Sequence, residues 1–227
     1  MTGAEAVAQI QQGIGFRTDL ATQILAALNF AQDEHEQAGF TLPEFLKTST
    51  TLSTATGSTT LLIPSDFIKE VPSLEGPLRY PTTATSRAFY ATKTGRVVGD
   101  SFFLGRLDVE GSTVTSDLEV ASGFPQAYAL QQTNILVWPI PDAVYNLTFR
   151  YYRHDSDIAN DSTTNNWLTY HPWVLISEAG WKIAADLQNN AAMQKFSQIG
   201  SAANRNLLSW VIEREVAGRR FYLGGRL

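Results

Sequence analysis

Hydrophobic residues recur with the period of a helix at both ends of the chain, and this pattern limits the possible folds more than any other feature. The helix predicted over residues 19–38 carries its apolar residues on one face, at Leu20, Ile24, Ala27, Leu28 and Ala31. Thr18 or Asp19 can cap its start. A shorter helix over residues 3–12 is expected before it, so the first part of the chain is predicted to form a helical hairpin.

The same period returns after residue 171. Pro172 suits the first turn of a helix, and the apolar residues of that helix share one side, at Trp173, Ile176, Gly180, Ile183 and Leu187. A second helix is predicted over residues 191–216, with Phe196, Ile199, Ala203, Leu207 and Val211 in register. The C-terminal part is therefore predicted to contain two paired helices.

Between these ends, from Leu46 to Tyr152, short apolar runs alternate with Thr, Ser and Gly, as is typical of short strands. Strands are expected at Thr50–Ser53, Thr59–Ile63, Phe89–Thr92, Arg96–Val98 and Ser101–Leu104. Residues 123–152 contain three further runs separated by turn residues, which predicts a three-stranded meander. Residues 108–122 are polar and weakly patterned, which favours a loop.

An amphipathic hairpin needs a partner for its apolar face. The simplest packing joins the N- and C-terminal helices into one bundle with an antiparallel β domain inserted between them, so the predicted fold class is α+β. The expected parts are a helical hairpin at residues 1–46, the inserted β domain at 47–153, helices that complete the bundle at 154–217, and an extended tail at 218–227.

The formal net charge of −5 is unevenly distributed. Residues 1–204 carry 12 basic and 20 acidic side chains, a net charge of −8, whereas residues 205–227 carry 5 basic and 2 acidic side chains, a net charge of +3. An acidic body argues against tight binding of DNA, because affinity for phosphates comes from Lys and Arg. It suits a surface past which DNA slides without sticking.

The sequence also bears on membrane insertion, export and redox environment. Neither a signal peptide nor an apolar run of the ~18 residues that a spanning helix requires is visible in the sequence, so we expect no membrane partner. The absence of cysteine excludes disulfides and thiolate metal sites, and it suits assembly in a reducing cytosol.

The sequence contains no nucleophile elbow, Walker loop or dinucleotide fingerprint, so we expect neither an enzyme nor a cofactor. Asp155, Asp157 and Asp161 resemble the start of a calcium loop, but the glycine and the final glutamate that such a loop requires are missing, so an acidic linker is the favoured interpretation. The three histidines are scattered without the spacing of a zinc site. No metal site is predicted.

The C-terminal segment is too short to form a core, yet it is rich in the residue types that are enriched in protein interfaces. The predicted docking residues are Arg219, Arg220, Phe221, Tyr222, Leu223, Arg226 and Leu227. A docking peptide that becomes ordered against a partner is the preferred interpretation. A terminus that packs back on its own bundle is the alternative.

The order of several motifs resembles that of the head-to-tail adaptor, or connector, proteins of tailed bacteriophages. These motifs are the N-terminal helical hairpin, Leu62-Ile63-Pro64-Ser65-Asp66-Phe67, Gly123-Phe124-Pro125, Trp138-Pro139-Ile140-Pro141-Asp142, Tyr151-Tyr152 and the paired helices from Trp173. The segment from Gly76 to Ser122 has no counterpart in that pattern.

This resemblance implies a structural virion protein, most similar to those of short-tailed phages. Such proteins form a ring, dodecameric as a rule, at the neck beneath the portal. The partners that it implies are the portal protein, tail or nozzle proteins, and other copies of the chain, with DNA passing through the channel without sequence-specific binding. Residues 217–227 would reach into the portal, after assembly in the host cytoplasm.

Two alternatives belong to other classes of protein. A β-rich tail-spike or decoration module, binding a glycan or another virion protein, predicts exposed aromatic residues on the β region. A phage hydrolase predicts a clustered acid and base, which the spacing of residues does not reveal.

Overall fold

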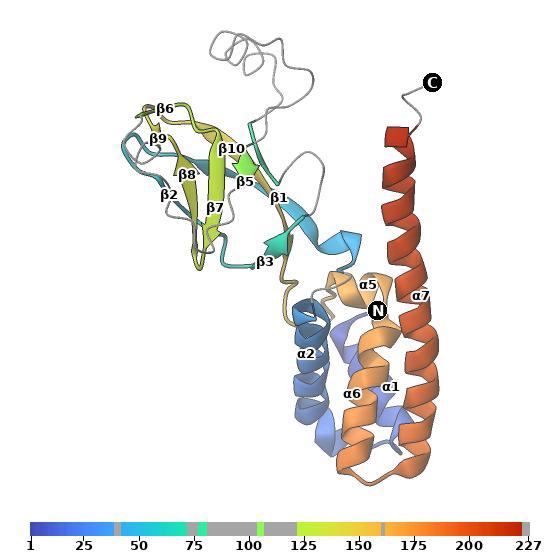
Figure 1. Ribbon diagram of the computed structural model, residues 1–227. Coiled ribbons are helices and arrows are strands. Elements are labelled where there is room, and N and C mark those ends of the chain that lie inside the picture. The colour runs from blue at the N-terminus through green and yellow to red at the C-terminus, as the bar shows by residue number, and fades with distance from the viewer. Residues whose placement is uncertain (39–41, 72–76, 81–103, 107–121, 160–161, 224–227) are drawn as a thin grey trace. The chain divides into compact units, whose positions relative to one another are not determined.

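A computed structural model describes residues 1–38, 42–71, 77–80, 104–106, 122–159 and 162–223, and for residues 105–106 and 215–223 it describes the backbone only. The chain divides into two compact units. The helical unit comprises Met1–Leu46 and His154–Leu227, and the β unit comprises Lys47–Arg153. Helices at both ends with a central, mainly antiparallel β region confirm the predicted α+β class (Figure 1).

The N-terminal hairpin consists of α1 (Gly3–Gly13) and α2 (Ala21–Gln37), joined through the short 3-10 helix η1 (Thr18–Leu20). Thr2 caps α1 in a capping box with Glu5. Asp19 does not cap α2 as predicted, because its carboxylate pairs with the guanidinium of Arg17 at 2.8 Å. A second 3-10 helix, η2 (Glu44–Leu46), ends the N-terminal part of the helical unit.

The C-terminal part contains α5 (Asn166–Tyr170), α6 (Pro172–Asp186) and α7 (Asn190–Leu223). The apolar helix α6 lies at the centre of the unit, where it packs against α1, α2, α5 and α7. The paired C-terminal helices are therefore confirmed, and Pro172 occupies the first turn of α6 as predicted. The five-residue helix α5 was not predicted.

The end of α7 differs from the prediction. The helix was expected to stop before Gly218 and to be followed by an extended tail, but it continues to Leu223. One glycine inside a helix costs only about 1 kcal/mol relative to alanine, which the helix formers around it can offset. Residues 224–227 lie outside the described part of the chain.

The described part of the β unit contains two four-stranded sheets and a small two-stranded one. In the first sheet, β10 (Asn146–Arg153) pairs with β1 (Lys47–Ser53), β3 (Phe67–Glu70) and β4 (Leu78–Arg79). In the second, β8 (Asn134–Trp138) lies between β2 (Thr60–Leu62) and β7 (Ala127–Gln131), and β5 (Gly105–Arg106) pairs in parallel with β7. Strands β6 (Ser122–Gly123) and β9 (Ile140–Pro141) form the small parallel sheet.

The predicted meander is therefore wrong in its third strand. Strands β7 and β8 form the expected hairpin, but β10 belongs to the other sheet. Pro139 and Pro141 separate β8 from β10, and proline cannot donate a hydrogen bond to a neighbouring strand. The connection therefore leads the chain away from β8. The strands predicted at residues 89–92 and 96–98, most of 101–104 and most of the loop at 108–122 lie outside the described residues.

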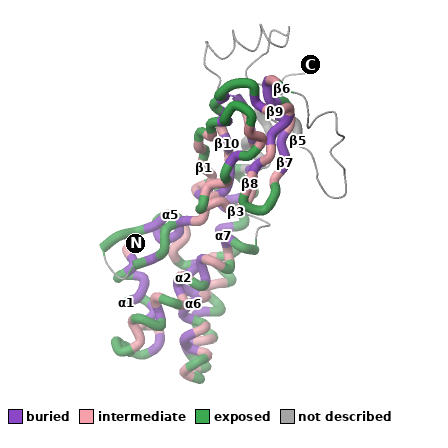
Figure 2. The backbone as a smooth tube through the Cα atoms, turned by 90° about the vertical axis from the view of Figure 1, so that its left-hand side faces the viewer, coloured by how far each residue is buried: buried purple, intermediate pink, exposed green. Residues whose placement is uncertain are grey.

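Each unit has its own core (Figure 2). The core of the β unit is largely aromatic, with Tyr80, Phe124, Tyr128, Tyr145, Phe149 and Tyr151 among its buried members. The aromatic side chains in the described part of this unit are buried or half-buried. None of the helices in the described part of the chain combines the length and the apolar character that spanning a bilayer requires.

Candidate functional site

Five of the seven predicted docking residues, Arg219–Leu223, form the end of α7, whereas Arg226 and Leu227 lie outside the described residues. The structure gives the backbone of Arg219–Leu223 but not the contacts of their side chains. The described contacts that position this end of α7 are those that hold the rest of the helix against the helical unit.

The first turns of α7 are held by Phe196, which is buried. A Cβ atom placed on Gly180 of α6 would lie 2.6 Å from the Phe196 ring, and one placed on Gly13 of α1 would lie 2.4 Å from it. Both distances are too short for non-bonded atoms, so only glycine permits this approach. One aromatic ring thus joins α7 to two other helices of the unit.

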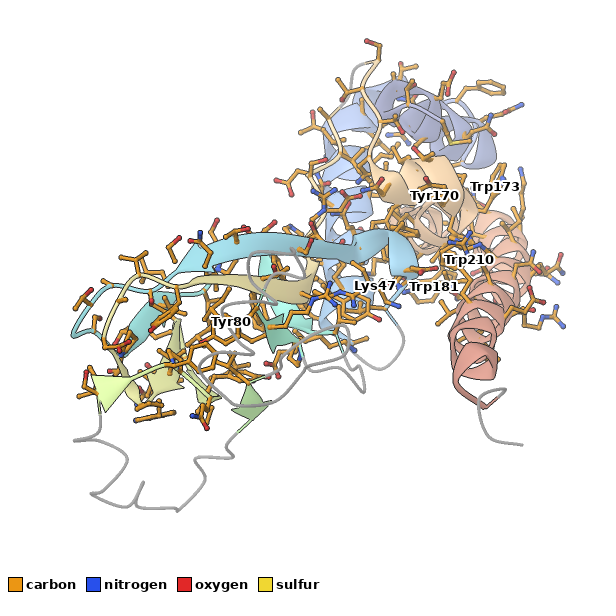
Figure 3. The ribbon with its side chains drawn as sticks, turned by 90° about the horizontal axis from the view of Figure 1, so that it is seen from above. Lys47, Tyr80, Tyr170, Trp173, Trp181 and Trp210 are labelled. Carbon is orange, nitrogen blue, oxygen red and sulfur yellow. The ribbon has the colours of Figure 1, made fainter. Side chains whose placement is uncertain are left out.

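The middle of α7 rests on an aromatic cluster formed by Phe45, Trp167, Tyr170, His171 and Trp210. The Phe45 ring meets Trp167 edge-on at 5.2 Å between centroids and stacks on Tyr170 at 5.3 Å. His171 meets Trp210 of α7 edge-on at 5.2 Å. Figure 3 labels Tyr170 and Trp210 of this cluster.

Arg214 fixes α7 at a third place. Its guanidinium lies over the Trp210 ring, 4.3 Å from the centroid, and its Nη1 donates a hydrogen bond of 3.0 Å to Glu44 Oε2. Both side chains are about half exposed, so the ion pair contributes at most about 1 kcal/mol. The contact therefore helps to orient α7 at Arg214 but adds little to stability.

A buried carboxylate lies beneath the aromatic cluster. Glu36 of α2 is 2 % exposed. Its Oε1 accepts hydrogen bonds from the indole of Trp167 and from the backbone of Asp155, and its Oε2 contacts the imidazole of His154. Burial raises the pKa of Glu36, although the bonds from His154 and Trp167 act in the opposite direction. A buried charge is tolerated because every contact is a donor.

His154 responds to the same arrangement. Burial lowers the pKa of the imidazole, but the hydrogen bond to Glu36 and the nearby carboxylates of Asp33 and Asp157 outweigh it, so the net shift is upward. Nε2 of the ring lies 3.8 Å from the Asp33 carboxylate and 3.7 Å from that of Asp157. The acidic neighbourhood therefore favours the protonated form of His154.

Side-chain amides complete the attachment of residues 154–159 and 162–165 to α2. Asn29 exchanges two hydrogen bonds with the backbone of Ile158, at 3.1 and 2.7 Å. Gln32 donates to the Asp155 carbonyl at 3.1 Å and accepts from the Asn165 amide at 2.8 Å. These bonds satisfy backbone groups of a segment without regular structure, as burial requires.

A second set of ionic contacts joins α2 to α6. Nε2 of His35 lies 2.9 Å from Glu178 Oε2, although the angle is not that of a hydrogen bond, and Lys182 pairs with Glu34 and Glu178. Burial alone would raise the pKa of Glu178, but His35 and Lys182 outweigh it and lower the pKa to about 2. The group stays ionised at any physiological pH, as suits a structural contact.

The carboxylates considered for calcium have other partners. Asp155 is buried and accepts two hydrogen bonds from Asn166, at 2.7 and 3.0 Å, at the start of α5. Asp157 is exposed, and Asp161 lies outside the described residues. Among the described residues, no group of three or more histidines and carboxylates could hold a metal ion.

Tyr145 and Tyr151, two of the three tyrosines that donate to carboxylates in the described part of the β unit, lie in its core. The hydroxyl of Tyr151 donates to Asp66 at 2.9 Å, and that of Tyr145 donates to Asp142. Burial, with the neighbouring carboxylate, raises the pKa of each phenol to about 12. Both hydroxyls therefore remain protonated, and they act as donors within the core rather than as bases.

Sequence reasoning missed the Glu36–Trp167 pair and the position of Phe45. One signal was present, because Gln32 and Glu36 continue the i, i+4 series of Ile24 and Leu28 on the buried face of α2. Polar residues on such a face predict a buried polar network. Phe45 offered no comparable signal, since it lies in a three-residue helix.

Comparison with known sequences gives one family. The sequence model of the SU10 adaptor protein family matches residues 1–219. This range includes the whole β unit and the helical unit up to Arg219 of α7. No curated protein matches the chain.

Proposed function

Because the chain belongs to the SU10 adaptor protein family, we propose that it forms a ring that joins the portal of a phage head to the tail. The family name makes the protein a structural adaptor of the phage virion, where it contacts other virion proteins. The finer proposal is that the ring is dodecameric, that it sits at the neck of a short-tailed phage, and that it opens a path for genome ejection.

The observation that carries this proposal is the extent of the family match, residues 1–219. It includes the bundle and the inserted β unit together, so the likeness is not confined to one motif. The helical unit adds support, because α7 is anchored to the bundle at Phe196, at the aromatic cluster and at Arg214. A helix held in this way can present its last turns to a partner.

The end of α7 is the proposed portal-docking segment. It comprises the predicted residues Arg219, Arg220, Phe221, Tyr222 and Leu223, with Arg226 and Leu227 beyond them. Each contact can be weak, because repetition around a ring raises the total affinity through avidity. Host cytoplasm is the proposed site of this assembly step, and tail or nozzle proteins are the proposed partners on the other side.

The charge distribution supports a role next to DNA without tight binding. Residues 1–204 have a net charge of −8, and surfaces of that sign do not neutralise phosphates. A channel lined by such a surface would let DNA pass without sequence-specific contacts. We propose that the ring continues the channel of the portal in this way.

The alternative of a glycan-binding β module has less support. It requires exposed aromatic side chains on the β unit, but in the described part of that unit these side chains are buried or half-buried. The exposed large apolar side chains there are Leu62 and Val144, which are aliphatic. Neither offers the flat ring on which sugars stack.

Electron cryo-microscopy of particles that contain this chain tests the proposal. The expected result is a closed ring on the particle axis beneath the portal, with the end of α7 against portal subunits. Density for the chain at the tail periphery, or particles that lack the chain, would contradict the portal-to-tail role.

A further inference from the structure

One face of the first β sheet is basic, although the chain as a whole is acidic. Side chains alternate between the two faces along a strand, and residues directly opposite each other on paired strands share a face. Phe149 and Tyr151 of β10 belong to the aromatic core. Arg150 and Tyr152 of the same strand therefore lie on the opposite face of the sheet.

The pairing of the strands brings further basic residues to this face. Lys47 of β1 and Lys69 of β3 are both paired with Tyr152. Arg79 of β4 is paired with Thr148, which shares the face of Tyr152. Four cations from four strands thus lie on one side of the sheet. We call this set the basic face, and its members are Lys47, Lys69, Arg79 and Arg150.

No carboxylate from the described strands of this sheet shares the basic face. Glu70 is the one acidic residue in β1, β3, β4 and β10. It is paired with Tyr151 on the core side, where its Oε1 accepts a hydrogen bond of 2.6 Å from Tyr128. The exposed residues Ser49 and Thr51 of β1 add hydroxyl groups to the basic face.

Two of the four cations have hydrogen-bond donors to spare. Arg150 is partly exposed, and its guanidinium forms no hydrogen bond or ion pair within the described residues. The ammonium of Lys47 lies over the Tyr152 ring, 5.7 Å from the centroid, and has no oxygen acceptor among the described residues. Lys69 and Arg79 make other contacts and add positive charge. A guanidinium offers five N–H donors and an ammonium three, so this face can bind an anion.

The acidic charge of the chain belongs to the helical unit. Residues 1–46 and 154–204 carry 3 basic and 11 acidic side chains, whereas residues 47–153 carry 9 of each kind. The described residues of the β unit include 6 basic and 3 acidic ones. The net charge of −8 on residues 1–204 therefore does not arise in the β unit.

We propose that the basic face binds the phosphodiester backbone of DNA. Arginine, lysine, serine and threonine are side chains that contact phosphates in protein–DNA complexes, and this face presents all four. An acidic protein segment fits less well, because lysine is depleted in protein interfaces and none of the exposed large apolar residues lies in the strands of this sheet. Contacts to phosphates carry no sequence information, so the binding has no sequence preference.

Binding through this face is expected to be weak and sensitive to salt. Neutralising phosphates releases condensed counterions, so four cations predict a slope of log affinity against log salt no steeper than about −4. Such a contact keeps DNA near the surface without holding it tightly. Its use in guiding DNA through a channel rests on the proposed function, whereas the binding itself is a property of the single chain.

Fluorescence anisotropy of a labelled duplex of arbitrary sequence, titrated with the full-length chain at several salt concentrations, tests the proposal. Lys47→Gln/Arg150→Gln should lower the affinity about tenfold and make the salt slope shallower by about two. Lys195→Gln/Arg205→Gln is the matched control, because it removes one lysine and one arginine from exposed positions of α7. The control should keep the affinity and the slope of the wild-type chain. Deletion of residues 218–227 removes the basic terminus and should leave the effect of the first pair unchanged.

Two further measurements guard against misfolding of the variants. The charge-preserving Lys47→Arg/Arg150→Lys should bind DNA within about twofold of the wild-type affinity, because the phosphate contact depends mainly on charge. In the wild-type chain, duplex DNA should slow acetylation of Lys47 at least about threefold, as neutralised phosphates shield the ammonium, and should not slow that of Lys195. Mass spectrometry measures both rates.

Several results would overturn the proposal. One is an affinity that does not change in Lys47→Gln/Arg150→Gln, or that falls equally in the α7 control. Another is loss of all binding on deletion of residues 218–227, which would assign the DNA contact to the terminus. Inorganic phosphate that competes as well as duplex DNA would indicate a site for the free ion. Preferential binding of a polyglutamate peptide would indicate an acidic protein partner.

The proposed adaptor role is tested separately by the ring beneath the portal. A ring on the particle axis, formed by a chain whose basic face does not bind DNA, would overturn this inference and leave the adaptor role intact. DNA binding through the basic face by a chain that forms no such ring would overturn the adaptor role and leave this inference intact.

Discussion

The indole N–H of Trp167 donates a hydrogen bond of 2.8 Å to the carboxylate of Glu36, which is almost completely shielded from water. Trp167 comes from the C-terminal part of the chain and Glu36 from the N-terminal hairpin, with the whole β unit between them in the sequence. The bond therefore joins the two halves of the helical unit. Trp167 also belongs to the aromatic cluster that contacts α7 at Trp210.

Replacing Trp167 by phenylalanine should lower the free energy of unfolding by about 1–3 kcal/mol, because a buried charged acceptor loses its donor. Chemical denaturation measures this loss. In a Glu36→Gln background the same replacement should cost less, since the charge that needs the donor is gone. An equal loss in both backgrounds would mean that the effect is one of packing. Trp173→Phe, at a half-exposed indole, is the control and should change stability by less than about 0.5 kcal/mol.

The pair of Glu36 and His154 predicts a pH dependence of stability. The pKa of His154 is raised above its ordinary value of 6.5 in the folded chain. The folded state therefore holds this proton more tightly than the unfolded state, so its stabilisation is complete below pH 6.5 and is lost as the pH rises through the folded-state value. The pKa of Glu36 is also raised above its ordinary value of 4.5. The contribution of Glu36 to stability therefore also falls with rising pH, in a range more acidic than that of His154.

Burial lowers the pKa of His171. The contribution of His171 to stability therefore increases with pH, over nearly the same range in which that of His154 decreases. The quantity to measure is therefore the difference in unfolding free energy between the wild-type chain and His154→Gln at each pH. This difference should shrink as the pH is raised from 6.5 towards 8. A difference that is constant or grows over this range would show that His154 is not protonated in the folded chain.

Gly180→Ala should destabilise the helical unit by about 1–3 kcal/mol, the usual cost of an added methyl group in a packed core. The new Cβ would lie 2.6 Å from the Phe196 ring, which is itself buried. Thermal unfolding followed by circular dichroism measures the effect. In a Phe196→Leu background the alanine should cost less, because the smaller side chain leaves room. If the cost were unchanged, the ring would not be the obstacle.

Deletion of residues 218–227 should leave the fold intact and abolish docking to the portal. Among the side chains of α7 that the structure describes, the buried hydrophobic ones, Ala192, Phe196, Leu207 and Val211, all precede the deletion. The unfolding midpoint should therefore stay the same while cosedimentation with isolated portal is lost. Docking by the truncated chain at wild-type strength would refute the proposed role of the end of α7.

The sequence predicted the helices best. The i, i+3, i+4 patterns of α2, α6 and α7 extend over several turns, and a long amphipathic pattern has few other interpretations. The predicted end of α7 was wrong because Gly218 was expected to stop the helix. Helix α5 was missed because five residues carry no periodicity.

The pairing of β10 could not be read from local sequence. Its partner β1 lies about 100 residues earlier, and register between distant strands depends on which faces are buried after the chain has collapsed. The docking residues at 219–227 remain a prediction, because their composition points to an interface without naming a partner. The polar network around Glu36 could have been found from the buried face of α2.

Strand β1 begins at Lys47 and β10 ends at Arg153, and Lys47 pairs directly with Tyr152. The chain therefore leaves the bundle and returns to it at adjacent points, since paired residues of antiparallel strands lie about 5 Å apart. An insertion with neighbouring ends can be lengthened, exchanged or lost while the helices around it keep their contacts. The middle of this protein can therefore change over evolution while the helical frame stays the same.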